Sequence, residues 1–302
     1  MQPISEPTPG LRASDTWAPA PALRARTFAC MGTVVSLTAP VGSGSAAQAD
    51  LDRLEAAAAV VEDQFAALDA QFSLYRPDSE ASRIARGELA LLQASPLLRD
   101  LYADAVRWRG RTDGAFTPER PDGLLDLGGL VKGYAIAEAG RSLVALGLHD
   151  WCLNAGGDVL VSGSPAPSSA SSASAAAGEA GAPPWLAGIV DPADRRTLLG
   201  SYPLGPRPPA RLALATSGSA ERGDHIWTVG LRGPSGHRRP EFAQVSVAAQ
   251  DIVTADVLAT AVVAGGRATL DAVTARWDVD VLAVAHDGGL LATPGFRAPS
   301  AA

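Results

Sequence analysis

One stretch organises this sequence: Asp126-Leu-Gly-Gly-Leu-Val-Lys-Gly133, an acid, two glycines and a lysine at the predicted start of a helix. Glycine lets a backbone approach a ligand closely. A helix start presents unpaired N–H groups and the positive end of the helix dipole to an anion. Lys132 adds a point charge that suits a phosphate. The stretch therefore predicts a phosphorylated ligand beside this helix.

Helices follow from the apolar spacing on either side of that stretch. From Gly129 we expect a helix to about Leu146, where Gly147 ends it. Ser95 and Pro96 have the residue types of an N-cap and a first helical position, so they predict the start of another helix. A long earlier helix is predicted by apolar residues spaced three and four apart: Leu51, Leu54, Ala58, Val61, Phe65, Leu68 and Phe72.

Strands are predicted between these helices rather than in strict alternation with them. They cover Thr27–Ala39, with Met31-Gly32-Thr33 midway, and then Trp151–Asn154, Val159–Val161, Trp185–Val190, Leu212–Ala215, His225–Gly230, Phe242–Ala248 and Val281–Ala285. A further helix is expected over Thr254–Val263, ended by Gly265-Gly266. This order favours an α+β fold, with mixed or antiparallel sheets flanked by helices.

Composition indicates one globular domain with terminal extensions. The chain has 302 residues, 47% of them apolar, and a formal net charge of −7, which disfavours nucleic acid as a partner. We expect a disordered leader at 1–25, one domain over 26–296 with a low-complexity insertion at 164–184, and a tail at 297–302. No apolar run suggests a membrane span or a signal peptide, which favours the cytoplasm, although export stays possible.

The two cysteines, Cys30 and Cys152, lie in apolar contexts and have no metal-binding spacing. We expect both to be small buried hydrophobes. The sequence also contains no P-loop, G-x-G-x-x-G, G-x-S-x-G or H-E-x-x-H motif. Their absence disfavours the classical dinucleotide folds and the common hydrolase and zinc-protease classes.

A carboxylate and a hydroxyl share one face of the predicted late helix. Asp256 and Thr260 are four residues apart, and with backbone carbonyls they suit a hard cation such as Mg²⁺. Thr254 is a plausible N-cap of this helix. The alternative for Asp256 is simple pairing with the helix dipole in the first turn.

Two small polar segments and two aromatic side chains are further candidates for the ligand-binding or catalytic site. Gly156-Gly157-Asp158 is either a ligand loop or an ordinary hairpin turn, and Thr216-Ser217-Gly218 reads as a turn that could present N–H groups and hydroxyls to phosphate. Tyr75 is either a ring that stacks on a planar ligand or a rim aromatic. His225 is either catalytic or structural.

Together these clusters resemble the ApbE family, the Mg²⁺-dependent FAD:protein FMN transferases. The resemblance runs from about Phe28 to Gly266 through seven elements in order: Met31-Gly32-Thr33, Phe72-Ser73-Leu74-Tyr75, Gly114-Ala115-Phe116, Asp126 to Gly129 with Lys132-Gly133-Tyr134, Asn154 to Asp158, Thr216-Ser217-Gly218, and Ala255-Asp256 with Ala259-Thr260.

The resemblance implies a role for each matched residue. A site for FAD is implied for Met31, Tyr75, Ala115, Phe116, Thr117, Asp126, Lys132, Gly156, Gly157 and Ser217. Ligands for Mg²⁺ are implied at the Gly129 carbonyl, Asp256 and Thr260. His225 matches the candidate base, which would deprotonate a threonine or serine hydroxyl of an acceptor protein so that it attacks the FMN phosphorus and AMP leaves.

The sequence departs from the family pattern in three places. Thr117 stands where the family usually has aspartate, the connection from Thr117 to Asp126 is short, and Trp227-Thr228 replaces an Asp-Pro pair after His225. Two other activities stay open: FAD pyrophosphatase, with water in place of the acceptor hydroxyl, and FAD binding without catalysis.

Overall fold

The computed structural model describes residues 22–166, 182–218 and 240–297. Its strands are β1 (Ala22–Cys30), β2 (Thr33–Val41), β3 (Trp151–Ala155), β4 (Asp158–Ser162), β5 (Trp185–Val190), β6 (Leu198–Leu204), β7 (Ala213–Gly218), β8 (Phe242–Ala249), β9 (Asp280–Ala285) and β10 (Leu290–Ala292). Its helices are α1 (Ala46–Phe72), α2 (Glu80–Ala85), the 3₁₀ turn η1 (Leu91–Gln93), α3 (Pro96–Arg111), α4 (Gly128–Ala145), α6 (Ile252–Arg276) and α7 (Pro294–Arg297).

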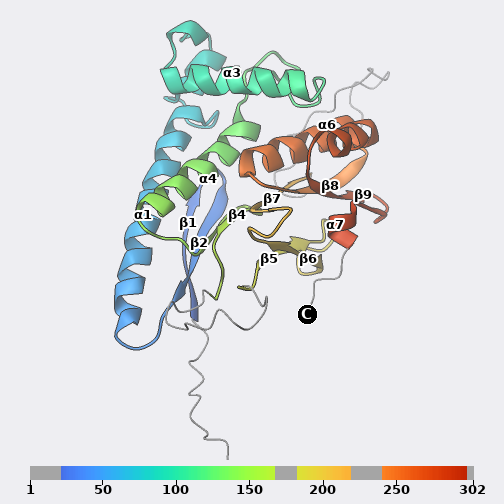
Figure 1. Ribbon diagram of the computed structural model, residues 1–302. Helices are drawn as coiled ribbons and strands as arrows, with labels where there is room; N and C mark the ends of the chain where they lie inside the picture. Colours follow the sequence, from blue (N-terminus) through green and yellow to red (C-terminus); the bar gives the residue numbers. More distant parts are fainter. Residues whose placement is uncertain (1–21, 167–181, 219–239, 298–302) are drawn as a thin grey trace, which may run out of the picture.

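Eight strands form one sheet in the order β1-β2-β3-β4-β7-β8-β9-β10, with every neighbouring pair antiparallel (Figure 1). β5 and β6 form a separate antiparallel ribbon. The predicted α+β class is confirmed. The sheet joins segments far apart in sequence, since Val159 of β4 pairs with Leu214 of β7.

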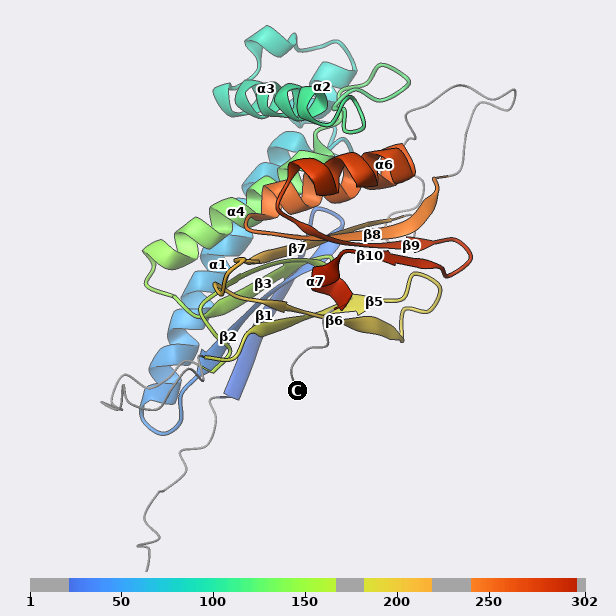
Figure 2. The ribbon, with the colours of Figure 1, turned by 45° about the vertical axis from the view of Figure 1, so that its right-hand side comes forward.

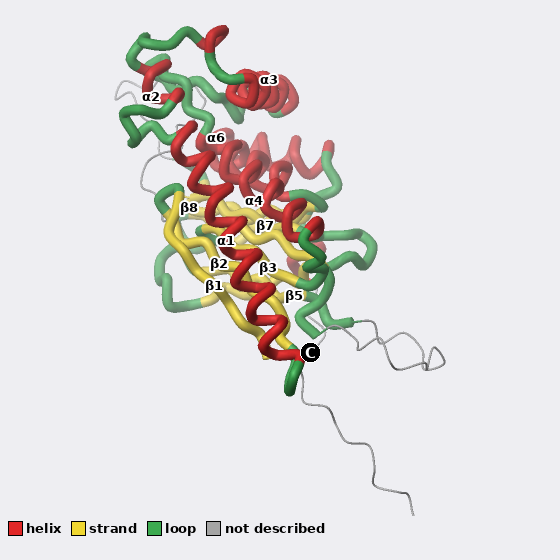
Figure 3. Tube along the Cα trace, turned by 90° about the vertical axis from the view of Figure 1, so that its left-hand side faces the viewer, coloured by secondary structure: helices red, strands yellow, loops and turns green. Residues whose placement is uncertain are grey.

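The two faces of the sheet carry different layers. α1, α4 and α6 lie side by side on one face (Figure 3), whereas the β5–β6 ribbon and α7 lie on the other (Figure 2). α2, η1 and α3 form a helical cap beyond the ends of α1, α4 and α6. The molecule therefore has three layers, with the predicted ligand helix α4 in the middle of the helical layer.

The main hydrophobic core lies between the helices and the sheet. The stripe predicted on α1 is buried at Leu54, Ala58, Val61, Phe65, Leu68 and Phe72, although Leu51 lies at its margin. α1 has no side-chain cap and no acid in its first turn, so burial of this stripe is its main source of stability. α3 begins as predicted, because the Ser95 hydroxyl accepts a hydrogen bond from Leu98 N–H.

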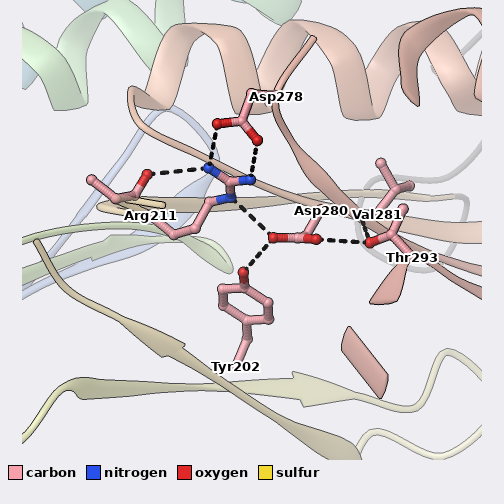
Figure 4. Close-up of polar contacts among 7 residues, drawn as sticks. Tyr202, Arg211, Asp278, Asp280, Val281 and Thr293 are labelled. Atoms are coloured by element: carbon pink, nitrogen blue, oxygen red, sulfur yellow. Dashed lines mark hydrogen bonds and ion pairs between the residues drawn. The ribbon is translucent and has the colours of Figure 1, made fainter. Parts of the chain in front are cut away.

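A smaller core and a polar network attach the ribbon to the other face. The core includes Val159, Trp185, Ile189 and Leu204. In the network, shown in Figure 4, the Asp280 carboxylate accepts hydrogen bonds from Tyr202 (2.7 Å), Arg211 (3.0 Å) and Thr293 (3.0 Å). Arg211 also pairs with Asp278 at 2.6 Å. These contacts connect β6, the 205–211 loop, β9 and the segment before α7.

Two predictions at the N-terminal end are wrong in detail. The expected single strand over Thr27–Ala39 is two strands, β1 and β2, that fold back at Met31 (φ 50°) and Gly32 (φ 71°). The expected leader at 1–25 extends too far, because β1 begins at Ala22. The missed turn has a clear cause: non-glycine residues rarely adopt positive φ, so Met31 gives no turn signal.

The late helix α6 is longer than predicted and is capped differently. Its N-cap is Asp251, whose carboxylate accepts a hydrogen bond from Thr254 N–H at 2.8 Å, so the N-cap prediction for Thr254 is wrong. Gly266 breaks the helix (φ 67°, ψ −152°), as the Gly265-Gly266 signal indicated, but a second helical segment continues to Arg276. α6 is long and apolar enough to cross a membrane, yet 61% of its most apolar window is buried inside the fold, which is typical of a core helix.

The remaining predictions have mixed outcomes, and some lie outside the described residues. Thr216-Ser217-Gly218 is not a turn but the end of β7, and the helix from Gly129 is confirmed as α4. Both cysteines are free as expected but half-buried rather than buried, and burial raises the pKa of Cys152 to about 12. The predicted strand at His225–Gly230, and residues 167–181 of the predicted insertion at 164–184, fall outside the described residues.

Candidate functional site

The site begins at the start of α4, where Asp126 closes the first turn. The Asp126 carboxylate accepts a hydrogen bond from Gly128 N–H at 2.8 Å, and its own N–H donates to the Pro118 carbonyl at 2.8 Å. Leu127, the formal N-cap, makes no side-chain cap bond. Asp126 therefore satisfies one of the N–H groups that a helix start leaves unpaired.

A glycine brings α4 and α6 into direct contact beside that start. Gly133 N–H donates to Asp256 Oδ2 at 3.1 Å. A Cβ at position 133 would lie 3.2 Å from the same oxygen and 3.3 Å from the Val253 Cα, so a larger residue would push the helices apart. In a regular α-helix this N–H serves the carbonyl four residues earlier, that of Gly129. Asp256 Oδ2 therefore competes with the Gly129 carbonyl oxygen for the Gly133 N–H.

Lys132 joins two buried carboxylates from different parts of the chain. Its ammonium forms an ion pair with Asp158 Oδ2 and lies 3.6 Å from Asp256 Oδ1. The side chains of Asp158, Asp256 and Lys132 are 0%, 1% and 12% exposed, respectively. Lys132 and Asp256 are thus at one site, as the predicted pocket requires.

A pair of hydroxyl groups extends the site from α6 to β7. The Thr260 and Ser217 hydroxyl oxygens lie 3.1 Å apart. The hydroxyls of Thr216 and Ser246 lie 2.8 Å apart, but on the opposite face of the sheet. A Cβ at Gly129 would lie 3.9 Å from the Thr260 methyl carbon and 3.2 Å from the Phe116 ring. The three predicted cation ligands, Gly129, Asp256 and Thr260, are therefore neighbours.

The Gly156-Gly157 pair is the two-residue turn of the β3–β4 hairpin. Both have positive φ, 63° and 92°, and Gly157 N–H donates to Asn154 Oδ1 at 2.9 Å. A Cβ at Gly156 would collide with the Thr33 hydroxyl, two residues beyond Met31. The turn is thus an ordinary hairpin in geometry, and it also places Asp158 in the site with the Met31 turn alongside.

The remaining predicted residues lie around this centre. Ala115 and Phe116 are buried, and Thr117 receives a hydrogen bond from Glu119 N–H at 3.2 Å. Tyr75 is 90% exposed in the loop after α1. Burial, followed by the Asp69 carboxylate, raises the pKa of the Cys30 thiol beside the Met31 turn. We call Lys132, Asp158, Asp256 and Thr260, with the Gly129 carbonyl, the central group. Among the described residues, no side-chain hydrogen bond joins Tyr75 to this central group, and His225 lies outside the described residues.

The donor set suits a hard cation better than a transition metal. Among the described residues, no cluster of three His, Cys, Asp or Glu side chains could hold a metal ion. The central group instead supplies the Asp256 carboxylate, the Thr260 hydroxyl and the contested Gly129 carbonyl, all oxygen donors. Two carboxylates and one ammonium also leave one negative charge buried here, which an added cation would offset.

Sequence reasoning gave no role to Asp158. Asp158 is fully buried, and besides pairing with Lys132 it accepts a hydrogen bond from Thr216 N–H at 3.0 Å. The available signal was a charged residue at the first position of an apolar strand.

Comparison with known proteins gives one consistent family. The sequence matches the family model described as the ApbE family over residues 31–120 and 117–283. The FAD:protein FMN transferase of Rhodobacter capsulatus is 31% identical over 215 residues, which cover 69% of this chain and 35% of that protein. The chain thus spans about a third of the length of this curated relative.

Solved structures share the fold. The ApbE protein of Thermotoga maritima superposes with a TM-score of 0.68 at 20% identity, covering 91% of this chain and 98% of that one. The flavin transferase ApbE of Vibrio cholerae superposes with a TM-score of 0.63 at 20% identity, covering 92% and 99%. At these identities the likeness concerns the fold alone.

Proposed function

The chain belongs to the ApbE family, and from that membership we propose that it transfers the FMN part of FAD to a threonine or serine hydroxyl of an acceptor protein, with Mg²⁺ bound and AMP released. The observation that carries the proposal is the central group itself. Lys132 lies 3.6 Å from Asp256 beside the start of α4, so phosphate-binding and cation-binding groups share one site.

In the proposed reaction the chain's own groups mainly bind and orient the FAD diphosphate. The start of α4 and the Lys132 ammonium supply positive electrostatic potential to its oxygens. Asp256 and Thr260, with the Gly129 carbonyl, would hold Mg²⁺, which when bound neutralises phosphate charge and polarises the phosphorus. Burial makes each of these interactions stronger than it would be in water, so positioning and electrostatics supply most of the acceleration.

The rim residues fit the recognition of the flavin. Met31 lies in the β1–β2 turn and Tyr75 in the loop after α1, and an exposed tyrosine ring can stack on a planar ligand. His225 is proposed as the base that takes the proton of the acceptor hydroxyl.

A product assay tests the function. The protein is incubated with FAD, Mg²⁺ and a candidate acceptor that contains a threonine, and AMP release and the acceptor mass are followed. We expect the acceptor to gain the mass of FMN minus water while AMP appears in equal amount. FMN and AMP without a modified acceptor would indicate hydrolysis instead, and unchanged FAD would indicate binding alone; either result contradicts the proposal.

A further inference from the structure

Asp158 is held by the backbone of two strands before it contacts Lys132. It is the first residue of β4, directly after the Gly156-Gly157 turn. β7 continues past its last paired position with β4, and there the Asp158 Oδ1 accepts the hydrogen bond from Thr216 N–H. A fully buried carboxylate fixed in this way has little freedom to move.

Lys132 is placed between two carboxylates that differ in distance. Its ion pair with Asp158 is the shorter, and the separation from Asp256 is 3.6 Å. Asp256 is also held, since its Oδ2 accepts the Gly133 N–H. An ammonium seated fully on Asp256 would compete for the same oxygens with a divalent cation. The position of Lys132 therefore decides how well Asp256 can serve as a cation ligand.

We propose that Asp158 is a positioning residue, which draws the Lys132 ammonium towards β4 and so leaves the Asp256 carboxylate able to take a divalent cation. This inference rests on the proposed function, in which Asp256 binds Mg²⁺ and Lys132 binds phosphate. It adds a third charged residue whose effect is exerted through Lys132 rather than by touching the ligand.

The first test measures Mg²⁺ affinity directly, without nucleotide, by isothermal titration of protein freed of metal with a chelator. Asp158→Asn should weaken Mg²⁺ binding by about tenfold or more, because a nearby negative charge is lost and Lys132 is left to Asp256. Mg²⁺ binding as tight as in the wild type would overturn the proposal.

Asp150→Asn is the matched control. Asp150 precedes β3 at the opposite end of the same hairpin, roughly 16 Å away along five strand residues, and its Oδ1 also accepts one backbone hydrogen bond, from Ser164 N–H at 2.8 Å. The same loss of charge beyond a Debye length should leave Mg²⁺ affinity unchanged.

The second test asks whether Asp158 acts through Lys132. Lys132→Met removes the competing ammonium and should tighten Mg²⁺ binding by about tenfold or more, while it weakens FAD binding. The double variant Asp158→Asn/Lys132→Met has the same net charge in the central group as the wild type. Its Mg²⁺ affinity should return to within about threefold of the wild-type value. A double variant that binds as weakly as Asp158→Asn would overturn the proposal.

Two further results keep the inference separate from the function on which it rests. If Asp158→Asn does not fold, Lys132→Met alone decides, and unchanged or weaker Mg²⁺ binding contradicts the inference. If the wild type itself binds no Mg²⁺, the cation site of the proposed function is refuted. In that case the Asp158–Lys132 pair is tested by urea denaturation in the presence of chelator. The double variant should lose less free energy of unfolding than the sum of the losses in the two single variants. Losses that simply add would show that Asp158 does not hold Lys132.

Discussion

At the scale of single residues, Asp256 is the meeting point of the site. One of its oxygens accepts the Gly133 N–H at 3.1 Å and the other lies 3.6 Å from the Lys132 ammonium. It thereby connects α6 to two positions on α4. Its side chain is almost fully buried, so its charge has little screening by solvent.

Replacement of Asp256 should abolish metal-dependent activity. For Asp256→Ala we expect kcat/KM for FMN transfer to fall by about a hundredfold or more, because the proposed Mg²⁺ site would lose the one carboxylate assigned to it. AMP release at saturating Mg²⁺ measures this, with Asp150→Asn as the control that should stay close to wild type. Activity that survives the change would refute the metal assignment.

Gly156 should tolerate no side chain. Its φ is 63°, and a Cβ would collide with the Thr33 hydroxyl. For Gly156→Ala we expect the free energy of unfolding to fall by about 1–3 kcal/mol, measured by urea denaturation. Gly200→Ala offers a comparison, because a Cβ there would meet no atom within 4 Å and φ is not positive. Equal losses in the two variants would contradict this account of the turn.

The sequence indicated most residues of the central group but not how they pair. Glycine, lysine and aspartate types at Gly129, Lys132 and Asp256 predicted phosphate and cation chemistry, and the resemblance placed them in one pocket. The contact between Lys132 and Asp158 depends on a hairpin turn and on strand order, neither of which a local pattern specifies. Asp158 was therefore recognised as part of a motif, but the sequence assigned it no function.

At the scale of elements, the long helices were predictable, whereas several strands and the shortest helices were not. Long stripes of apolar residues gave α1 and α4, since one face of each packs on the sheet. β6, with Gly200 and Pro203 and little alternation in burial, gave no strand signal. β10 and α7 have only three and four residues, too few to show a period, and the six-residue α2 was missed for the same reason.

The attachment of the β5–β6 ribbon should weaken at high pH. Burial, followed by the hydrogen bond to Asp280, raises the pKa of Tyr202 above its ordinary value. Unfolded tyrosine ionises near pH 10, so the stabilisation is complete below about pH 10 and is lost as pH rises further towards the folded pKa. We expect the free energy of unfolding to fall between about pH 10 and 11.

Tyr202→Phe isolates this contribution. Tyr102 and Tyr134, whose pKa values are also raised, are present in both proteins, so the difference between wild type and variant reports Tyr202. The variant should be less stable by about 1 kcal/mol at pH 8 and should lose less stability on going to high pH. Urea curves at each pH measure both quantities, and parallel pH profiles would contradict the assignment.

At the scale of the whole molecule, the site lies where the helical layer meets the sheet. It takes residues from α4, α6, β4 and β7, so a ligand there contacts elements from residue 126 to residue 260. A cation that binds only the folded arrangement must stabilise the whole fold by mass action.

Mg²⁺ should therefore raise the midpoint temperature of unfolding. At a concentration of about a hundred times Kd the gain is about 2.7 kcal/mol, which corresponds to roughly 5 °C for a chain of this size. Differential scanning fluorimetry measures the shift, with potassium chloride at the same ionic strength as the control. Asp256→Ala should show no shift, and an equal shift in that variant would locate the cation elsewhere.

The two edges of the large sheet have unequal consequences for self-association. β10 is a three-residue edge beside α7, whereas β1 is a nine-residue edge whose side chains are mostly exposed. A long open edge can template pairing with another molecule, and charged side chains along it oppose such pairing. Arg24 and Arg26 carry charge on this strand. Arg26 also pairs with Glu55 of α1, so an apolar residue there would remove both an attachment of the edge strand and a charge that opposes edge-to-edge pairing. These two arginines would therefore be poor choices for apolar replacement in engineering this scaffold.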